Sequence, residues 1–206
     1  MIGYCSWTAT TSTLEMLESA GWRLLVSPWS MRKLKGKPPK WPSGRRARFA
    51  LDNGAWQYHQ KGGLFEELPF LWAYESVGHY ADFTVVPDKV GNREVTLAMA
   101  AEWFPRLKYG RKLIAVQDGM TPEDIMPYIK QGAGIFVGGT TEWKLSTIPL
   151  WGVVSKETGA WLHVGRVNSK KRINLCAENN ADSIDGSGPV RFPYHIESLT
   201  QALHQT

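Results

Sequence analysis

The chain has 206 residues, of which 43% are hydrophobic and 21% charged; this composition is typical of one globular domain and excludes disordered, collagen-like and coiled-coil proteins. No stretch approaches the roughly 20 apolar residues of a membrane span, and Met1–Cys5 lacks a signal-peptide pattern, so we expect a cytoplasmic protein without membrane contact. Cys5 and Cys176 are the only cysteines, too few for a disulfide framework or a cysteine-rich zinc site, so no metal is predicted.

Positive charge is concentrated in one segment. Between residues 32 and 48 the sequence holds eight of its 24 lysines and arginines and no acid, which leaves 16 basic residues against 19 acids elsewhere. The eight are Arg32, Lys33, Lys35, Lys37, Lys40, Arg45, Arg46 and Arg48. Interspersed Gly and Pro favour an exposed loop, placed at 29–48 between the second and third strands, over a regular helix. We expect this loop to bind nucleic acid, with Trp41 available for stacking; a merely solubilising loop is the alternative.

Short β-rich runs alternate with amphipathic stretches along the whole chain. The predicted strands are 2–7, 22–27, 48–52, 82–88, 113–117, 134–138, 161–167 and 182–185. A capping box at 12–15 and a glycine at 21 predict the ends of the first helix. Thr121, Pro122 and Gly132 bound a second, and apolar spacing predicts helices through 97–104 and 196–203, with a weaker one through 70–77.

Strict alternation of strands and helices predicts a parallel sheet. Eight such units favour an α/β fold of the closed (β/α)8, TIM-type class over an open sheet, as one domain spanning residues 1–206. Barrels of this kind typically have about 250 residues, so this one must have short helices. An open, doubly wound sheet is the alternative.

Acidic and amide side chains follow several of the predicted strands. They are Asp52 and Asn53 after the third, Asp88 after the fourth, Gln117 and Asp118 after the fifth, and Asp182 and Asp185 in the eighth. In a parallel barrel the strand ends meet at one mouth, where active sites lie, so we expect these side chains to converge. A single such Asp is more often a turn or capping residue; several together would repel one another unless they are used.

Known nucleotide and hydrolase motifs are missing from the sequence. It has no GxGxxG, no GxxxxGK[ST] and no GxSxG, and its five histidines are scattered without metal-ligand spacing. Two facing carboxylates can instead perform a double displacement at a sugar anomeric carbon, one attacking and the other transferring protons. Together with the basic segment, they indicate a sugar within nucleic acid, whose nucleobase must first be flipped out of the stack.

The chain resembles the tRNA-guanine transglycosylase superfamily, in particular its shorter members that insert 7-deazaguanine bases into DNA. Segments at successive strand ends carry the resemblance, in the family's order. They are 52–57 (Asp-Asn-Gly-Ala-Trp-Gln, similar to Asp-Ser-Gly-Gly-Phe-Gln), Asp88, 116–119 (Val-Gln-Asp-Gly, similar to Val-Gln-Gly-Gly), the Gly-Gly turn at 138–139, 163–165 (His-Val-Gly, similar to Met-Gly) and 182–185 (Asp-Ser-Ile-Asp, similar to Asp-Met-Phe-Asp). The resemblance covers most of the chain.

The resemblance implies a role for each matched residue. Asp185 is the expected nucleophile and Asp52 the general acid and base, while Asp88 reads the guanine edge. The expected substrate-binding residues are Asn53, Gly54, Asp88, Gln117, Gly138, Gly139, Val164 and Gly165. No cofactor is expected, because base exchange is nearly thermoneutral and the nucleophile is a side chain.

Departures from the family pattern point to the partner. The family's tRNA enzymes carry a cysteine and histidine zinc site after the barrel, and this sequence has no such residues, which favours DNA over tRNA. Asn53 and Ala55 replace Ser and Gly, and the cationic cluster after the nucleophile is reduced to Arg191. We therefore expect other residues to bind the polynucleotide backbone: Lys33, Lys35, Lys37, Arg45, Arg46, Arg48, Lys170, Lys171 and Arg172.

The sequence thus predicts a DNA-guanine transglycosylase that uses a free 7-deazaguanine base as co-substrate. A tRNA-directed transglycosylase, a DNA or nucleoside glycosylase with the same acids, and a catalytically silent nucleic-acid binder are the alternatives. The small size is compatible with a homodimer or a partner subunit. Asp118 and Asp182 are interpreted as loop and capping residues, whereas substrate contact and helix initiation stay open for Glu142 and Lys144. Stacking on the nucleobase is expected from among Trp56, Tyr58 and Trp143.

Overall fold

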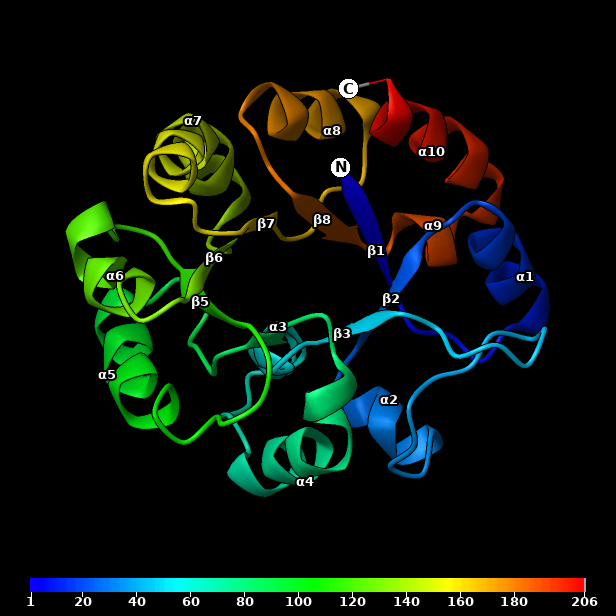
Figure 1. Ribbon diagram of the computed structural model, residues 1–206, viewed down its shortest axis with the longest axis horizontal. Coiled ribbons are helices and arrows are strands. Elements are labelled where there is room, and N and C mark those ends of the chain that lie inside the picture. The colour runs from blue at the N-terminus through cyan, green and yellow to red at the C-terminus, as the bar shows by residue number, and fades with distance from the viewer. Residues whose placement is uncertain (206) are drawn as a thin grey trace.

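Eight parallel strands close into a barrel in a computed structural model that describes residues 1–205. Figure 1 shows the strands in the middle of the molecule and the helices in a ring around them. The strands are β1 (Ile2–Ser6), β2 (Arg23–Val26), β3 (Phe49–Leu51), β4 (Thr84–Val85), β5 (Lys112–Val116), β6 (Gly134–Val137), β7 (Leu162–Val164) and β8 (Ser183–Gly186). The expected α/β fold of the TIM-barrel type is confirmed.

Pairing between the first and last strands excludes the open sheet. Tyr4 of β1 is in register with Asp185 of β8, and each remaining strand pairs with its neighbour in sequence order. The eighth strand is thereby fixed on both sides, by β7 and by β1.

Helices follow the strands around the barrel. They are α1 (Thr11–Ser19), α2 (Pro28–Lys33), α3 (Ala55–Gln60), α4 (Glu67–Val77), α5 (Arg93–Trp103), α6 (Pro122–Ile129), α7 (Thr141–Thr158), α8 (Lys170–Glu178), α9 (Gly188–Arg191) and α10 (Ile196–His204), with single 3-10 turns at Gly78–Tyr80 and Pro193–His195. In Figure 1, α3 lies inside the ring of outer helices. Among residues 1–205, no helix is both long and apolar enough to cross a membrane.

Short elements explain how a barrel fits into so few residues. Strand β4 has two residues, and β3 and β7 have three each, so the runs expected at 48–52, 82–88 and 161–167 are longer than the strands that form. The rest of each run makes the loops at the two ends of the barrel. We call the carboxyl ends of the strands the mouth and their amino ends the opposite rim.

Two hydrophobic layers hold the barrel. Inward-facing side chains form the smaller one: Tyr4, Ala50, Phe83, Val85, Leu113 and Ala115. The larger layer lies between the strands and the helices, and both Leu162 and Val164 of β7 belong to it. Because successive strand residues face opposite sides, His163 between them points into the barrel.

Helix ends follow local capping chemistry in one of the two predicted cases. Thr121 and Asp124 form a capping box at the start of α6, with Pro122 in the first turn, as the sequence predicts. The capping box expected at 12–15 is wrong, because α1 begins at Thr11 and its N-cap residue, Thr10, makes no side-chain capping bond.

The basic segment is more structured than a loop. Arg32 and Lys33 lie in the last turn of α2, which Ser27 and Ser30 cap and Pro28 begins. Trp41 is only 9% exposed and belongs to the hydrophobic core, which corrects the expectation that it is available for stacking.

Candidate active site

Polar side chains from four strand ends converge at the mouth. Asp52 follows β3, Asp88 follows β4, Gln117 follows β5 and Asp185 lies in β8. They line one cleft of about 330 Å³ together with Ser6, Leu25, Asn53, Ala55, Trp56, Gln57, Gln60, Val85, Val90, Phe136, Gly138, Gly139, Thr141, Arg166, Asn168, Arg172, Ser187 and Arg191. The expected convergence of the strand-end acids is therefore present.

Asp88 is buried and held by two amides. Asn53 Nδ2 donates to its Oδ1, and Gln117 Nε2 donates to its Oδ2, each at 2.6 Å. Burial raises the pKa of Asp88 to about 6, and these two donors and the Arg166 charge oppose the shift. The carboxylate is thus fixed in orientation, with its remaining lone pairs available to a ligand in the cleft.

The Gln117 amide also orders the backbone around the cleft. Its Oε1 accepts from the backbone N–H of Gly91 at 2.9 Å and of Gly139 at 2.8 Å. A Cβ at Gly138 would lie 2.6 Å from Gln117 Nε2, so only glycine lets the chain approach this amide. Gly139 has a φ of 71°, which a residue with a side chain rarely adopts.

Asp185 is 6% exposed and receives a hydrogen bond on each oxygen. His163 Nε2 lies 3.0 Å from its Oδ2, and the backbone N–H of Arg166 donates to its Oδ1 at 3.2 Å. A carboxylate with a fixed orientation at the edge of a cleft is suited to nucleophilic attack.

Asp52 differs from Asp185 in its surroundings. Burial and, after it, the negative charges of Asp185 and Asp88 raise the pKa of Asp52 to about 7, against backbone donors at Gly54 and Asn53. A carboxyl group with this pKa carries a proton for much of the time at neutral pH, as a general acid must.

Arg166 spans the mouth from β7 to the opposite side of the barrel. Its guanidinium carbon lies 4.0 Å from the ring centroid of Trp56, which follows β3, and its Nη2 donates to the carbonyl of Gly139. Arg166 adopts a left-handed backbone φ of 58°, and burial lowers its pKa. A planar, cationic fork stacked on an aromatic ring thus occupies the cleft between the acids.

Lys144 in α7 lies just behind this turn. It is 1% exposed, and its Nζ donates to the carbonyl of Gly165. Burial and the positive charge of Arg166 lower the pKa of Lys144 to about 8, while Asp185 opposes the shift. Lys144 therefore supports the backbone that carries the N–H donor to Asp185. Both Glu142 and Lys144 lie in the first turn of α7, as one of the two open alternatives has it, and neither lines the cleft.

Several predicted site residues lie elsewhere. Val164 is fully buried in the layer between barrel and helices, which corrects its expected place in the cleft. Gly54 is the N-cap residue of α3 with a φ of 82°, and a Cβ at Gly165 would lie 2.8 Å from the Phe136 ring, so both shape the site through the backbone.

Other acidic and aromatic candidates have structural partners. Asp118 accepts from the backbone N–H of Thr140 at 2.7 Å, and Asp182 accepts from that of Leu162 at 2.7 Å on the opposite rim. Of the three aromatic candidates, Trp56 lines the cleft, whereas Trp143 packs beside Gly139 and Trp151.

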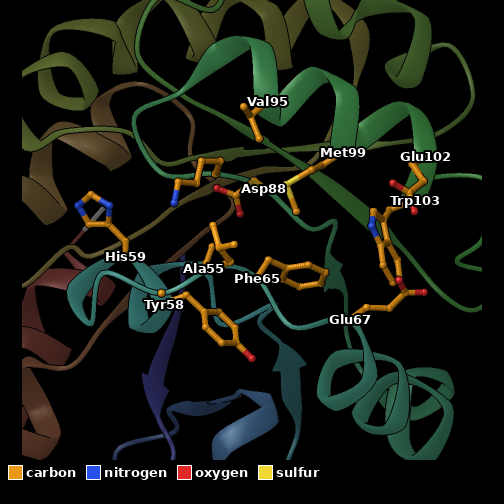
Figure 2. A pocket seen from close by; sticks show the side chains of 13 residues that line it. Ala55, Tyr58, His59, Phe65, Glu67, Asp88, Val95, Met99, Glu102 and Trp103 are labelled. Atoms are coloured by element: carbon orange, nitrogen blue, oxygen red, sulfur yellow. The ribbon is translucent and has the colours of Figure 1, made fainter.

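Tyr58, the third aromatic candidate, lines a second pocket beside Asp88. Figure 2 shows this pocket with Tyr58 and Phe65 on one side and Met99 and Trp103 on the other. Its volume is about 310 Å³, and it shares Ala55 and Asp88 with the cleft at the mouth.

The expected cationic residues divide between the two ends of the barrel. Arg172 lines the cleft, and Lys170 and Lys171 are exposed at the start of α8 beside it. Lys33 lines an adjoining pocket of about 290 Å³ that also includes Asp52. Lys35 and Lys37 follow α2 on the outside of the barrel, near α4.

Arg45, Arg46 and Arg48 lie on the opposite rim. Arg45 pairs with Glu18 at 2.7 Å, and Arg48 pairs at 2.7 Å with Asp82, which precedes β4. Arg46 lies over the Tyr80 ring. These three arginines therefore lie at the other end of the barrel from the cleft that contains Asp52 and Asp185.

Sequence reasoning missed Arg166 and the role of His163, and it left Lys144 open. Arg166 was not among the candidates, and His163 entered only as the first residue of the 163–165 segment. Arg166 is the first cation after a strand end, a position that in a barrel faces the mouth and offered a usable signal. The burial of Lys144 and the approach of His163 to Asp185 depend on contacts 21 and 22 residues apart, which periodicity does not reveal.

No protein-family model matches this chain, and no curated protein matches it either. Within residues 1–205, no three His, Cys, Asp or Glu side chains are grouped so that they could hold a metal ion. The function is therefore argued from the cleft itself.

Proposed function

We propose that the protein is a DNA-guanine transglycosylase, which exchanges guanine in DNA for a 7-deazaguanine base such as 7-cyano-7-deazaguanine. The observation that carries the proposal is a pair of carboxylates, Asp185 and Asp52, which line one cleft and have different surroundings. Asp185 is oriented by two N–H donors, while the pKa of Asp52 is raised to about 7. One group is suited to attack and the other to proton transfer.

In the first half-reaction Asp185 attacks C1′ of a flipped deoxyguanosine. A bond forms between its carboxylate oxygen and C1′ as the bond from C1′ to N9 of guanine breaks, and Asp52 gives its proton to the departing guanine. The product is a sugar ester of Asp185 together with free guanine.

The second half-reaction reverses these steps with a new nucleobase. The incoming deazaguanine loses its ring N–H proton to the Asp52 carboxylate, its nitrogen attacks C1′, and the ester bond to Asp185 breaks. Two displacements at one carbon retain the configuration, and Asp52 ends with the proton that it had at the start.

The nucleobase edge is recognised by Asp88, Gln117 and Gly139 in this proposal. The fixed Asp88 carboxylate accepts from the amide and amino groups of guanine, and the Gly139 backbone offers further polar atoms. The Arg166 guanidinium donates to the carbonyl of Gly139 and lies over the Trp56 ring. The Arg166 side chain must therefore move before a flat nucleobase can contact the Gly139 carbonyl or stack on Trp56.

DNA is the proposed partner, and the cations at the mouth support it. Arg172 and Arg191 line the cleft, with Lys170 and Lys171 beside it, so phosphates on either side of a flipped nucleotide have cationic neighbours on the side of β7 and β8. A tRNA-directed exchange would use the same acids and remains the second candidate.

Nucleoside mass spectrometry tests the proposal directly. The purified protein is incubated with 7-cyano-7-deazaguanine and, in separate tubes, DNA and tRNA. We expect the deazaguanine deoxynucleoside in the DNA tube alone, and no product with Asp185→Asn. Modification of tRNA alone would overturn the substrate, abasic product without insertion would indicate a glycosylase, and no change in either tube would contradict base exchange by this chain.

A further inference from the structure

A chain of side-chain hydrogen bonds runs through the barrel interior and ends at Asp185. Trp161 Nε1 donates to Ser183 Oγ at 3.0 Å, and Ser183 Oγ lies 2.8 Å from His163 Nδ1. His163 Nε2 lies 3.0 Å from Asp185 Oδ2. The chain therefore rises from the opposite rim, where Trp161 precedes β7, to the mouth.

The donors in this chain fix where the histidine proton lies. The indole N–H of Trp161 can only donate, so Ser183 Oγ accepts there and has its own proton to give. His163 Nδ1 is its partner among residues 1–205 and must accept, which leaves the imidazole proton on Nε2. With the opposite tautomer, a bare Nε2 would face the lone pairs of Asp185, and the Ser183 proton would lack an acceptor.

Packing keeps the imidazole in this position. His163 is 0% exposed, and its ring stacks on Phe136 with centroids 4.9 Å apart. Phe83 and Tyr4 lie against it at 5.0 and 5.8 Å. Rotation of the ring would break both of its hydrogen bonds inside an apolar layer, where lost hydrogen bonds are costly.

We propose that His163 is the positioning residue of the nucleophile, a role that rests on the proposed function. Its Nε2–H donates to Asp185 Oδ2 at 3.0 Å, whereas the backbone N–H of Arg166 donates to Oδ1 at the longer distance of 3.2 Å. Because Oδ2 is held more closely, Oδ1 is the oxygen that attacks C1′. In the ester intermediate Oδ2 is the carbonyl oxygen, and the same N–H stabilises the negative charge that returns to the carboxylate when the ester breaks.

His163 does not act as a proton shuttle in this arrangement. Its ring is enclosed by aromatic side chains, and its Nδ1 lone pair accepts the hydrogen bond from Ser183, so no imidazole lone pair is left to accept a proton from the substrate. Proton transfer stays with Asp52.

A measurement on the resting protein tests the tautomer without any substrate. Two-dimensional NMR that correlates imidazole nitrogens with ring protons distinguishes the two neutral tautomers of His163. We expect the Nε2–H form in the wild-type protein. An Nδ1–H form would overturn the inference whatever reaction the protein performs.

Two variants test the positioning role. In His163→Gln the side-chain amide reaches toward Asp185 with an N–H, whereas His163→Leu has a similar volume and no donor. We expect His163→Leu to lower kcat for base exchange about 100-fold with little change in KM for the nucleobase, and His163→Gln to retain most of kcat. Equal losses in both variants, at equal thermal stability, would show a packing role and overturn the inference.

The two proposals fail in different ways. Absence of base exchange in the wild-type protein would overturn the proposed function and leave the tautomer measurement standing. Base exchange that His163→Leu supports at the wild-type rate would overturn the positioning role and leave the proposed function standing.

Discussion

Gln117 donates to Asp88 at 2.6 Å and so joins the end of β5 to the end of the neighbouring strand β4. The same amide accepts from Gly91 and Gly139, and Asn53 holds the other oxygen of Asp88 from the end of β3. Three neighbouring strands are thus linked through one carboxylate. The orientation of Asp88 is set before any ligand binds, which is the condition for selective recognition of a nucleobase edge.

Replacing this carboxylate tests the recognition. Asp88→Asn presents an N–H where the proposed nucleobase also donates, so we expect the affinity for 7-cyano-7-deazaguanine to fall by about tenfold or more, because a good hydrogen bond is lost and a donor is left unpaired. Calorimetric titration of the base measures the affinity. Asp118→Asn is the matched control, because Asp118 also follows a strand but accepts from the backbone N–H of Thr140. This variant should bind the base with wild-type affinity. Unchanged affinity in Asp88→Asn would contradict the assignment.

The pKa of Asp52, raised to about 7 by burial and by the neighbouring acids, predicts a pH dependence. Guanine release requires the protonated acid, so the single-turnover rate should be level below pH 6 and fall about tenfold per unit above pH 7. Rapid quench of guanine-labelled DNA measures this rate. Asp52→Asn should be about 10²- to 10⁴-fold slower, without the fall. A wild-type rate that increases from pH 7 to pH 9 would exclude Asp52 as the acid.

The same shift affects stability. The folded-state pKa of Asp52 is raised from 3.8 to about 7, so its contribution is present below the unfolded value and is lost as the pH rises through the folded value. At pH 8.5 the ionised carboxylate costs up to about 4 kcal/mol, and Asp52→Asn avoids this cost. Urea unfolding should therefore show a gain in stability from Asp52→Asn that is larger at pH 8.5 than at pH 5. An equal gain at both pH values would refute the pKa assignment.

Much of the barrel follows from local sequence patterns. Alternating strands and helices, the capping box at Thr121 and the acids at strand ends predict both the closed sheet and the convergence at the mouth, because strand ends meet on one side of any parallel barrel. The features that the sequence did not predict depend on which side of the barrel wall a residue faces, and on contacts between residues far apart in the chain. Val164 and Gly165 are adjacent, yet Val164 belongs to the outer layer while Gly165 lies against Phe136 and Asp185.

The position of the cations in the basic segment (residues 32–48) is likewise not predicted by the sequence. Counting charges identifies a run of cations but not the side of the barrel on which each one lies. Arg45 and Arg48 come just before β3 and pair with acids of the opposite rim, whereas Lys33 ends a helix that begins at the mouth. In a parallel barrel, charges before a strand and charges after it are at opposite ends, so one continuous run does not form one surface.

Two sets of charge replacements test which cations meet the polynucleotide. Substituting Lys170, Lys171 and Arg172 with Gln should weaken DNA binding and reduce the dependence of log affinity on log salt by up to about three units, because each phosphate contact contributes about 0.9. Fluorescence anisotropy at several salt concentrations measures the slope. Gln at Arg45, Arg46 and Arg48 is the matched control with the same change in charge and should leave the slope unchanged. The opposite pattern would place the polynucleotide on the opposite rim.

Pairing between β1 and β8 makes Asp185, the proposed nucleophile, dependent on barrel closure. Asn53, Asp88 and Gln117 depend on one another and on β3, β4 and β5, whereas Asp185 is in register with Tyr4 at the seam where the two ends of the sheet meet. A barrel opened at this seam would keep the proposed nucleobase-binding residues in place and displace the proposed attacking group. Base binding and catalysis can thus be separated by damage to the seam alone, and loss of the covalent step with retained base affinity would be the sign of an unclosed barrel.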